Sequence, residues 1–279
     1  MNYMKKYKIS IAFALVITFL ISFFILSNRQ CKLFLESSNN QSVSNRIFIM
    51  GHVYDTNSPN EFSTMLQSYL SKQIINSNDI GIFSGDIVIS PTEERLKESK
   101  KIISNYFTDF YVSAGNHDFG SEFNNIYGEY FYTFETNHFL VLGTSFNTQN
   151  WLPNENDQNL INYHIKETKK KNVLLISHQL FWINEVNNNL LSLVKAEPNS
   201  IPDKVTPSAD PFDWIELNDK KLIVVSGDSG KWGQEFYCKE LSNNLTVISN
   251  GLGGFQDDSI VILNENNLGY NFEVIYINR

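Results

Sequence analysis

The segment FYVSAGNHD, residues 110–118, joins a short apolar strand pattern to a run of polar residues. Gly115 permits a tight turn, and Asn116, His117 and Asp118 follow the strand at once. An amide, an imidazole and a carboxylate at one strand end are typical of a ligand site at a sheet edge. By composition, Gly-Asn-His-Asp is expected in about one random chain in several hundred, so it is more informative than a single turn.

Four other apolar strand patterns end in the same way. The polar residues after them are His52, Tyr54 and Asp55 (strand 47–50), Asp86 (strand 80–83), His178 (strand 173–177) and Asp228 (strand 222–226). Ligands bind at the carboxyl ends of strands in open α/β sheets. Oxygen and imidazole ligands without cysteine suit Zn, Mn or Fe. The pattern favours one shared metal site over a set of coincidental turns. The other histidines, His138 and His164, are assigned structural or surface roles.

The remaining pattern predicts one α/β domain over residues 47–279. Apolar residues at helical spacing predict a helix within 62–70, and Ser90, Pro91 and Glu93 predict the start of a second one. A third helix is expected over 157–171. Further strands are expected at 130–136, 138–144, 245–249, 260–263 and 271–277.

The N-terminus predicts a membrane anchor. Residues 9–27 contain no charge and would span about 28 Å as a helix. No small-residue cleavage pattern follows, so an uncleaved anchor is favoured over a cleaved signal. Lysines precede the run, which places residues 1–8 in the cytoplasm and the domain on the extracytoplasmic side. Residues 28–46 are polar and indicate a tether.

Composition excludes several classes of protein. The 279-residue chain is 42% apolar, which rules out disorder as its main state. The first 32 residues hold five bases and no acid, so the remainder has seventeen bases against thirty acids, a net charge of −13. No nucleic-acid binding is expected of so acidic a domain. The two cysteines, Cys31 and Cys238, exclude a disulfide scaffold. A disulfide between them is possible but only weakly favoured, because Cys31 lies beside the apolar run.

From about Ile47 to Ile277 the chain resembles the calcineurin-like metallophosphoesterase superfamily. The resemblance rests on Gly85-Asp86, on Gly115-Asn116-His117-Asp118 and on His178 after a strand. It implies an α/β fold of two packed β-sheets flanked by helices. It also implies hydrolysis of a phosphate ester with one or two divalent transition metals. The substrate and the oligomeric state cannot be read from the sequence.

The first and last motifs differ from the family pattern. His52 stands in place of an Asp, Tyr54 in place of a His, and Asp228 and Gly230 in place of two histidines. By position, one cation would be held by Asp86, Asn116, His178 and Asp228. A second would be held by Asp86 with His52, and Asp55 and Tyr54 are further candidates. Either an Asp and a His have exchanged motifs and a working site remains, or the second cation is lost and the domain binds one ion or none.

The resemblance also implies the roles of the remaining candidates. His117 would donate a proton to the leaving alkoxide, and Asp118 would orient its ring. Lys231 would place a positive charge near the phosphate, or is a solvated loop residue. Two functions follow: a membrane-anchored phosphoesterase, or a catalytically inactive relative that serves as a binding or scaffold protein of the cell envelope. The intact Gly-Asn-His-Asp favours the enzyme.

Overall fold

The computed structural model describes residues 44–146, 153–183, 210–230, 236–255 and 257–277, together with Cys31, Trp151, Ala196, Pro198 and Asn199. The predicted anchor at residues 9–27 lies outside them. No helix within the described part of the chain is long and apolar enough to cross a bilayer.

The described strands form two mixed sheets. The five-stranded sheet has the order β11-β10-β1-β2-β3, in which β1, β2 and β3 are parallel. Its strands are β1 (Asn45–Met50), β2 (Ile80–Ser84), β3 (Asp109–Ser113), β10 (Ser259–Glu265) and β11 (Tyr270–Tyr276). β10 runs antiparallel to both β1 and β11.

The six-stranded sheet has the order β4-β5-β6-β7-β9-β8. Its strands are β4 (Tyr132–Glu135), β5 (Phe139–Gly143), β6 (Asn172–Ser177), β7 (Lys221–Ser226), β8 (Tyr237–Ser242) and β9 (Leu245–Ser249). The four inner strands are parallel, and β4 and β8 are antiparallel edges.

Alternating side chains build three apolar layers. In β1, Ile47 and Ile49 pack between the two sheets, while Phe48 and Met50 face the helices α2 (Thr64–Leu70), α3 (Glu93–Ser104) and α4 (Ser121–Tyr127). In β6, the residues of one face join the layer between the sheets, and those of the other pack on α5 (Glu155–Glu167). Strands buried on both faces explain the nearly continuous apolar runs in the sequence.

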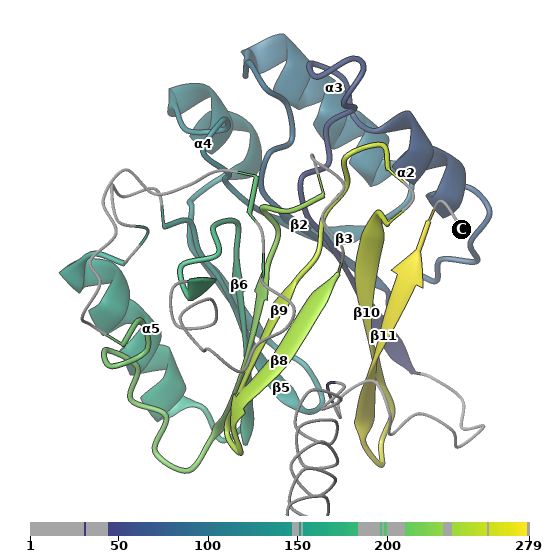
Figure 1. Cartoon of the computed structure of the whole chain (residues 1–279). Coiled ribbons are helices and arrows are strands. Elements are labelled where there is room, and N and C mark those ends of the chain that lie inside the picture. Colours follow the sequence, from purple (N-terminus) through teal and green to yellow (C-terminus); the bar gives the residue numbers. More distant parts are fainter. Residues whose placement is uncertain are drawn as a thin grey trace, which may run out of the picture.

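The result is a four-layer α/β sandwich, as predicted. Figure 1 shows α2, α3 and α4 on one side of the molecule and α5 on the other, with the sheets between them. This layering brings the carboxyl ends of β1, β2 and β3 beside those of β6 and β7.

Several local predictions were wrong. The N-cap of α3 is Thr92 rather than Ser90, because the Thr92 side chain accepts a hydrogen bond from Arg95 N–H. α4 and β8 were not predicted at all. β1 begins at Asn45, within the stretch assigned to the tether.

Cys31 and Cys238 form a disulfide, which the sequence had favoured only weakly. Their Cα atoms are 5.7 Å apart, within the usual range for a disulfide. Cys31 is buried in the layer between the sheets, beside Cys238 on the edge strand β8. The bond joins the segment before the domain to the six-stranded sheet.

Candidate metal centre

The candidate site lies where the carboxyl ends of the two sheets meet, and two of its residues have unusual backbone conformations. His52 follows β1 with φ of 49°, and Asp86 follows β2 with φ of 55°. Residues other than glycine seldom adopt this left-handed region, and such strain gathers at functional sites. The Asp86 carbonyl accepts hydrogen bonds from the N–H groups of Val53 and Tyr54 at 3.1 and 3.2 Å, which joins the two turns.

Glycines allow the two sheet edges to approach each other. A Cβ on Gly51 would lie 2.3 Å from the Cα of Gly227, so backbone packs directly on backbone there. A Cβ on Gly85 would lie 2.4 Å from Nδ1 of His178. Glycine is therefore required at both positions for the histidine of one sheet to reach the aspartate of the other.

Asp86, His178 and Asp228 converge on one point. One ligand atom from each lies within 4.8 Å of the others, and all three residues are buried. Nε2 of His178 lies 3.3 Å from Oδ1 of Asp86 and 3.6 Å from Oδ1 of Asp228. The same nitrogen lies 3.1 Å from the side-chain oxygen of Asn116. The four residues predicted to hold one cation therefore come together.

Backbone carbonyls fix the orientation of both site imidazoles. Nδ1 of His178 lies 2.8 Å from the Ser84 carbonyl, and Nδ1 of His52 lies 2.7 Å from the Leu252 carbonyl. A carbonyl only accepts, so Nδ1 must donate in each pair and Nε2 is left to bind a cation or a proton. Metal-binding histidines commonly have such a partner on their second nitrogen.

The donor set fits a divalent cation. Nε2 of a neutral His178 faces three oxygen acceptors, an arrangement that is unfavourable unless a cation or an extra proton lies among them. Two carboxylates, an imidazole and an amide oxygen are hard or intermediate ligands of the kind bound by Zn, Mn or Fe.

The pKa shifts in the site agree with an acidic cluster that favours positive charge. Burial lowers the pKa of His178, but Asp86 and Asp228 outweigh it and raise the pKa to about 10. For Asp86 burial raises the pKa, and the neighbouring imidazoles outweigh it and hold the pKa well below its ordinary value. Burial, together with repulsion from Asp86, raises the pKa of Asp118 to about 7.

His52 approaches the cluster from the other side of Asp86. Its Nε2 lies 3.8 Å from Oδ2 of Asp86, whereas His178 lies nearer to Oδ1. Tyr54 packs on the His52 ring, with centroids 4.3 Å apart. Burial raises the pKa of Tyr54 above its ordinary value, and Asp86, Asp228 and Asp118 raise it further.

Asp118 and Asp55 bind backbone groups. The Asp118 carboxylate accepts hydrogen bonds from Ile87 N–H and Gly115 N–H, which ties the turn after β2 to the turn after β3. The sequence analysis had instead assigned Asp118 to orienting the His117 ring. Asp55 accepts from Asn57 N–H, Ser58 N–H and both donors of Thr64 at the start of α2.

His117 lies at the edge of the site and is half-buried. Its backbone N–H donates to Oδ1 of Asp86 at 3.3 Å, and its ring contacts the Tyr54 ring edge-on, with centroids 6.2 Å apart. The backbone of His117 is therefore tied to the cluster, and its half-buried ring lies beside Tyr54. Lys231 lies outside the described residues.

The turn after β9 was missed by the sequence analysis. Leu252 donates its N–H to the Gly51 carbonyl and accepts from His52 through its own carbonyl. Asn250 donates from its side chain to the Ile49 carbonyl at 2.8 Å. Asn250-Gly251 directly follows an apolar strand, which is the same signal that located the other site residues.

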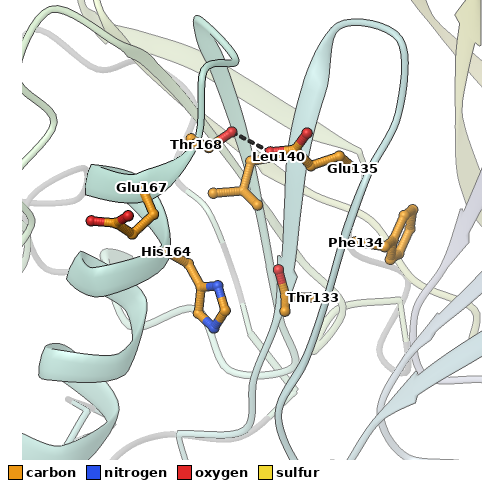
Figure 2. A pocket seen from close by; sticks show the side chains of 7 residues that line it. All are labelled: Thr133, Phe134, Glu135, Leu140, His164, Glu167 and Thr168. Carbon is orange, nitrogen blue, oxygen red and sulfur yellow. Dashed lines mark hydrogen bonds between the residues drawn. The ribbon is translucent and has the colours of Figure 1, made fainter.

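A cavity lies away from the metal centre, at the amino end of β5. It has a volume of about 290 Å³, and Figure 2 shows its lining from β4, β5 and the end of α5. The His164 ring points into it and stacks on Phe131. The remaining histidine, His138, bonds the Asn266 carbonyl through Nε2. Neither histidine lies near the metal cluster.

Comparison with solved structures identifies remote structural neighbours. No family model and no curated protein matches the sequence. The chain is similar to phosphopantetheinyl hydrolase (PptH) from Mycobacterium tuberculosis, with a TM-score of 0.45 and 8% identity over 76% of this chain and 92% of that one.

Two further neighbours are similarly distant. A protein serine/threonine phosphatase from Saccharomyces cerevisiae, with similarity to human phosphatase PP5, has a TM-score of 0.38 and 14% identity over 85% of this chain and 81% of that one. Vps29 from Entamoeba histolytica, complexed with Zn²⁺, has a TM-score of 0.36 and 8% identity over 84% and 99%. The function is therefore inferred from the side chains of the site.

Proposed function

We propose that this chain is a membrane-anchored, metal-dependent phosphoesterase of the calcineurin-like metallophosphoesterase superfamily. The observation that carries the proposal is the convergence of Asp86, His178 and Asp228 within 4.8 Å at the junction of the two sheets. Asn116 completes a set of four ligands, since its oxygen lies 3.1 Å from Nε2 of His178.

One cation would be held by Asp86, Asn116, His178 and Asp228, and a second would be held by Asp86 with His52. The metal would offset the negative charge of the phosphoryl group and lower the pKa of water at the site. Mn, Fe and Zn all suit these donors.

The protein's own residues orient and protonate the substrate. His117 is half-buried beside the cluster, and we assign it the transfer of a proton to the leaving alkoxide. We assign Asp118 a positioning role, because it fixes the backbone of the turn that carries His117.

The disulfide supports a location outside the cytoplasm. Disulfides form and persist in oxidising compartments and are rare in reducing ones. The Cys31–Cys238 bond therefore agrees with an anchor at residues 9–27 that leaves the domain on the extracytoplasmic side.

A second function has one observation in its favour. His52, Tyr54, Asp228 and Gly230 depart from the residues of the first and last family motifs. Such departures favour a catalytically inactive binding or scaffold protein of the cell envelope, in which the fold is kept without turnover.

Metal content and turnover of the full chain in detergent distinguish the two functions. The enzyme predicts tightly held Mn, Fe or Zn and hydrolysis of p-nitrophenyl phosphate or its diester, which chelation abolishes and metal restores. Asp86→Asn should lose the cation. His117→Gln should keep it and lose about 10²- to 10⁴-fold in kcat.

His138→Gln is the matched control, because this histidine bonds Asn266 at the opposite end of the sheets. It should retain wild-type turnover. A wild-type chain without metal and without turnover would support the scaffold. Full activity in both Asp86→Asn and His117→Gln would refute the assigned roles.

A further inference from the structure

Tyr54 is the aromatic side chain of the metal centre, and it is only 2% exposed. Its ring lies 4.3 Å from the His52 ring and makes an edge contact with the His117 ring at 6.2 Å. Its N–H donates to the Asp86 carbonyl, and an isolated bridge pairs it with Phe62. The ring is therefore held between the histidine beside the cation site and the histidine assigned to proton transfer.

Tyr54 lies beside the acidic cluster. It packs on the His52 ring, whose Nε2 lies 3.8 Å from Oδ2 of Asp86, and Asp118 and Asp228 also act on it electrostatically. A phosphate ester that enters this site adds further negative charge to three buried carboxylates. Besides the cation, binding of the ester requires hydrogen-bond donors directed at its non-bridging oxygens.

A phenol suits that task better than it suits metal binding. It carries its proton at neutral pH and donates one hydrogen bond without adding charge. Protein ligands of zinc are in contrast thiolates, imidazoles and carboxylates. The rings on both sides of Tyr54 also restrict its rotation, so little entropy is lost when the hydroxyl binds an oxygen.

We propose that Tyr54 is a substrate-binding residue whose hydroxyl donates a hydrogen bond to a non-bridging phosphoryl oxygen. This inference rests on the proposed phosphoesterase function, and it assigns Tyr54 to the substrate rather than to the cation. It assigns Tyr54 a part of the stabilisation of the phosphoryl oxygens that a further cation would otherwise supply.

The test compares inorganic phosphate binding by metal-loaded full chains in detergent, using calorimetry. Tyr54→Phe removes only the hydroxyl and keeps the ring between His52 and His117. A hydrogen bond to a charged group contributes about 1.5–3 kcal/mol, so the variant should bind phosphate about 10- to 100-fold more weakly. Its metal content and melting temperature should match those of the wild type.

Tyr106→Phe is the control, because the Tyr106 hydroxyl bonds the Gln67 carbonyl away from the site. It should bind phosphate as the wild type does. Unchanged phosphate affinity in Tyr54→Phe overturns the inference, and so does loss of the cation, which would make Tyr54 a ligand. A wild-type chain that binds metal but neither binds phosphate nor hydrolyses esters overturns the proposed function itself.

Discussion

At the scale of single residues, the metal centre depends on glycines as much as on the side chains that converge there. Gly51 and Gly227 meet backbone to backbone where the two sheets join, and a Cβ on Gly51 would lie 2.3 Å from the Cα of Gly227. Gly51→Ala should therefore push the sheet edges apart. We expect a loss of about 1–3 kcal/mol in the free energy of unfolding, typical of overpacking, and weaker metal binding.

Gly269→Ala is the matched control, because a Cβ at this position would meet no heavy atom within 4 Å beyond its two chain neighbours. It should leave both urea denaturation and metal affinity close to those of the wild type. If Gly51→Ala binds metal with wild-type affinity, the close approach of the two sheets does not set the geometry of the centre.

The sequence could predict which residues gather but not how each one is used. Asp86, Asn116, His178 and Asp228 follow strands that end at one edge, and the strand pattern alone indicates this. Asp118 binds backbone N–H groups because the turn after β2 lies close to the turn after β3. No local sequence pattern predicts that distance. The carbonyl partners of the imidazoles are likewise set by tertiary contacts.

At the scale of elements, Asp55 fixes the start of α2. Burial tends to raise the pKa of its carboxyl group, but hydrogen bonds from the Thr64 hydroxyl and from Asn57, Thr64 and Ser58 N–H outweigh burial and lower the pKa. A pKa that is lower in the folded state stabilises the fold above the unfolded value of about 4. This stabilisation disappears as the pH falls through the folded value.

Asp55→Asn should thus have a lower urea midpoint than the wild type at pH 6, and the difference should shrink as the pH approaches 3. Thr64→Val removes only the hydroxyl donor and should show a smaller difference with the same sign. A gap between wild type and Asp55→Asn that stays constant from pH 6 to pH 3 would show that the charge of Asp55 does not stabilise α2.

The elements missed by the sequence analysis are those with weak apolar patterns. α4 buries Phe123 alone among its seven residues, so its helical period has little contrast. β8 is an edge strand with the sequence YCKELS, and most of its residues are only half-buried. In contrast, the start of α3 was predicted from capping residues, and the continuous runs of β1 and β6 carry enough apolar contrast to be predicted.

At the scale of the whole molecule, the sandwich followed from the resemblance, whereas the contact that joins the N-terminal segment to it did not. Residues 31 and 238 are 207 positions apart, and separation in sequence says nothing about distance in space. Their pairing depends on β8 lying at the edge of the six-stranded sheet, where Cys238 packs against the layer between the sheets. β8 was itself not predicted, so no strand pattern added support to the weakly favoured disulfide.

The disulfide should contribute to the stability of the whole domain, because it closes a loop of 207 residues in the unfolded chain. Replacing both partners, as Cys31→Ser with Cys238→Ser, should lower the free energy of unfolding by about 2–4 kcal/mol, as measured by denaturant titration of the full chain in detergent. Reductant should bring the wild type to the stability of the double variant and leave that variant unchanged. Equal stability of wild type and double variant without reductant would mean that Cys31 does not hold the N-terminal segment to β8.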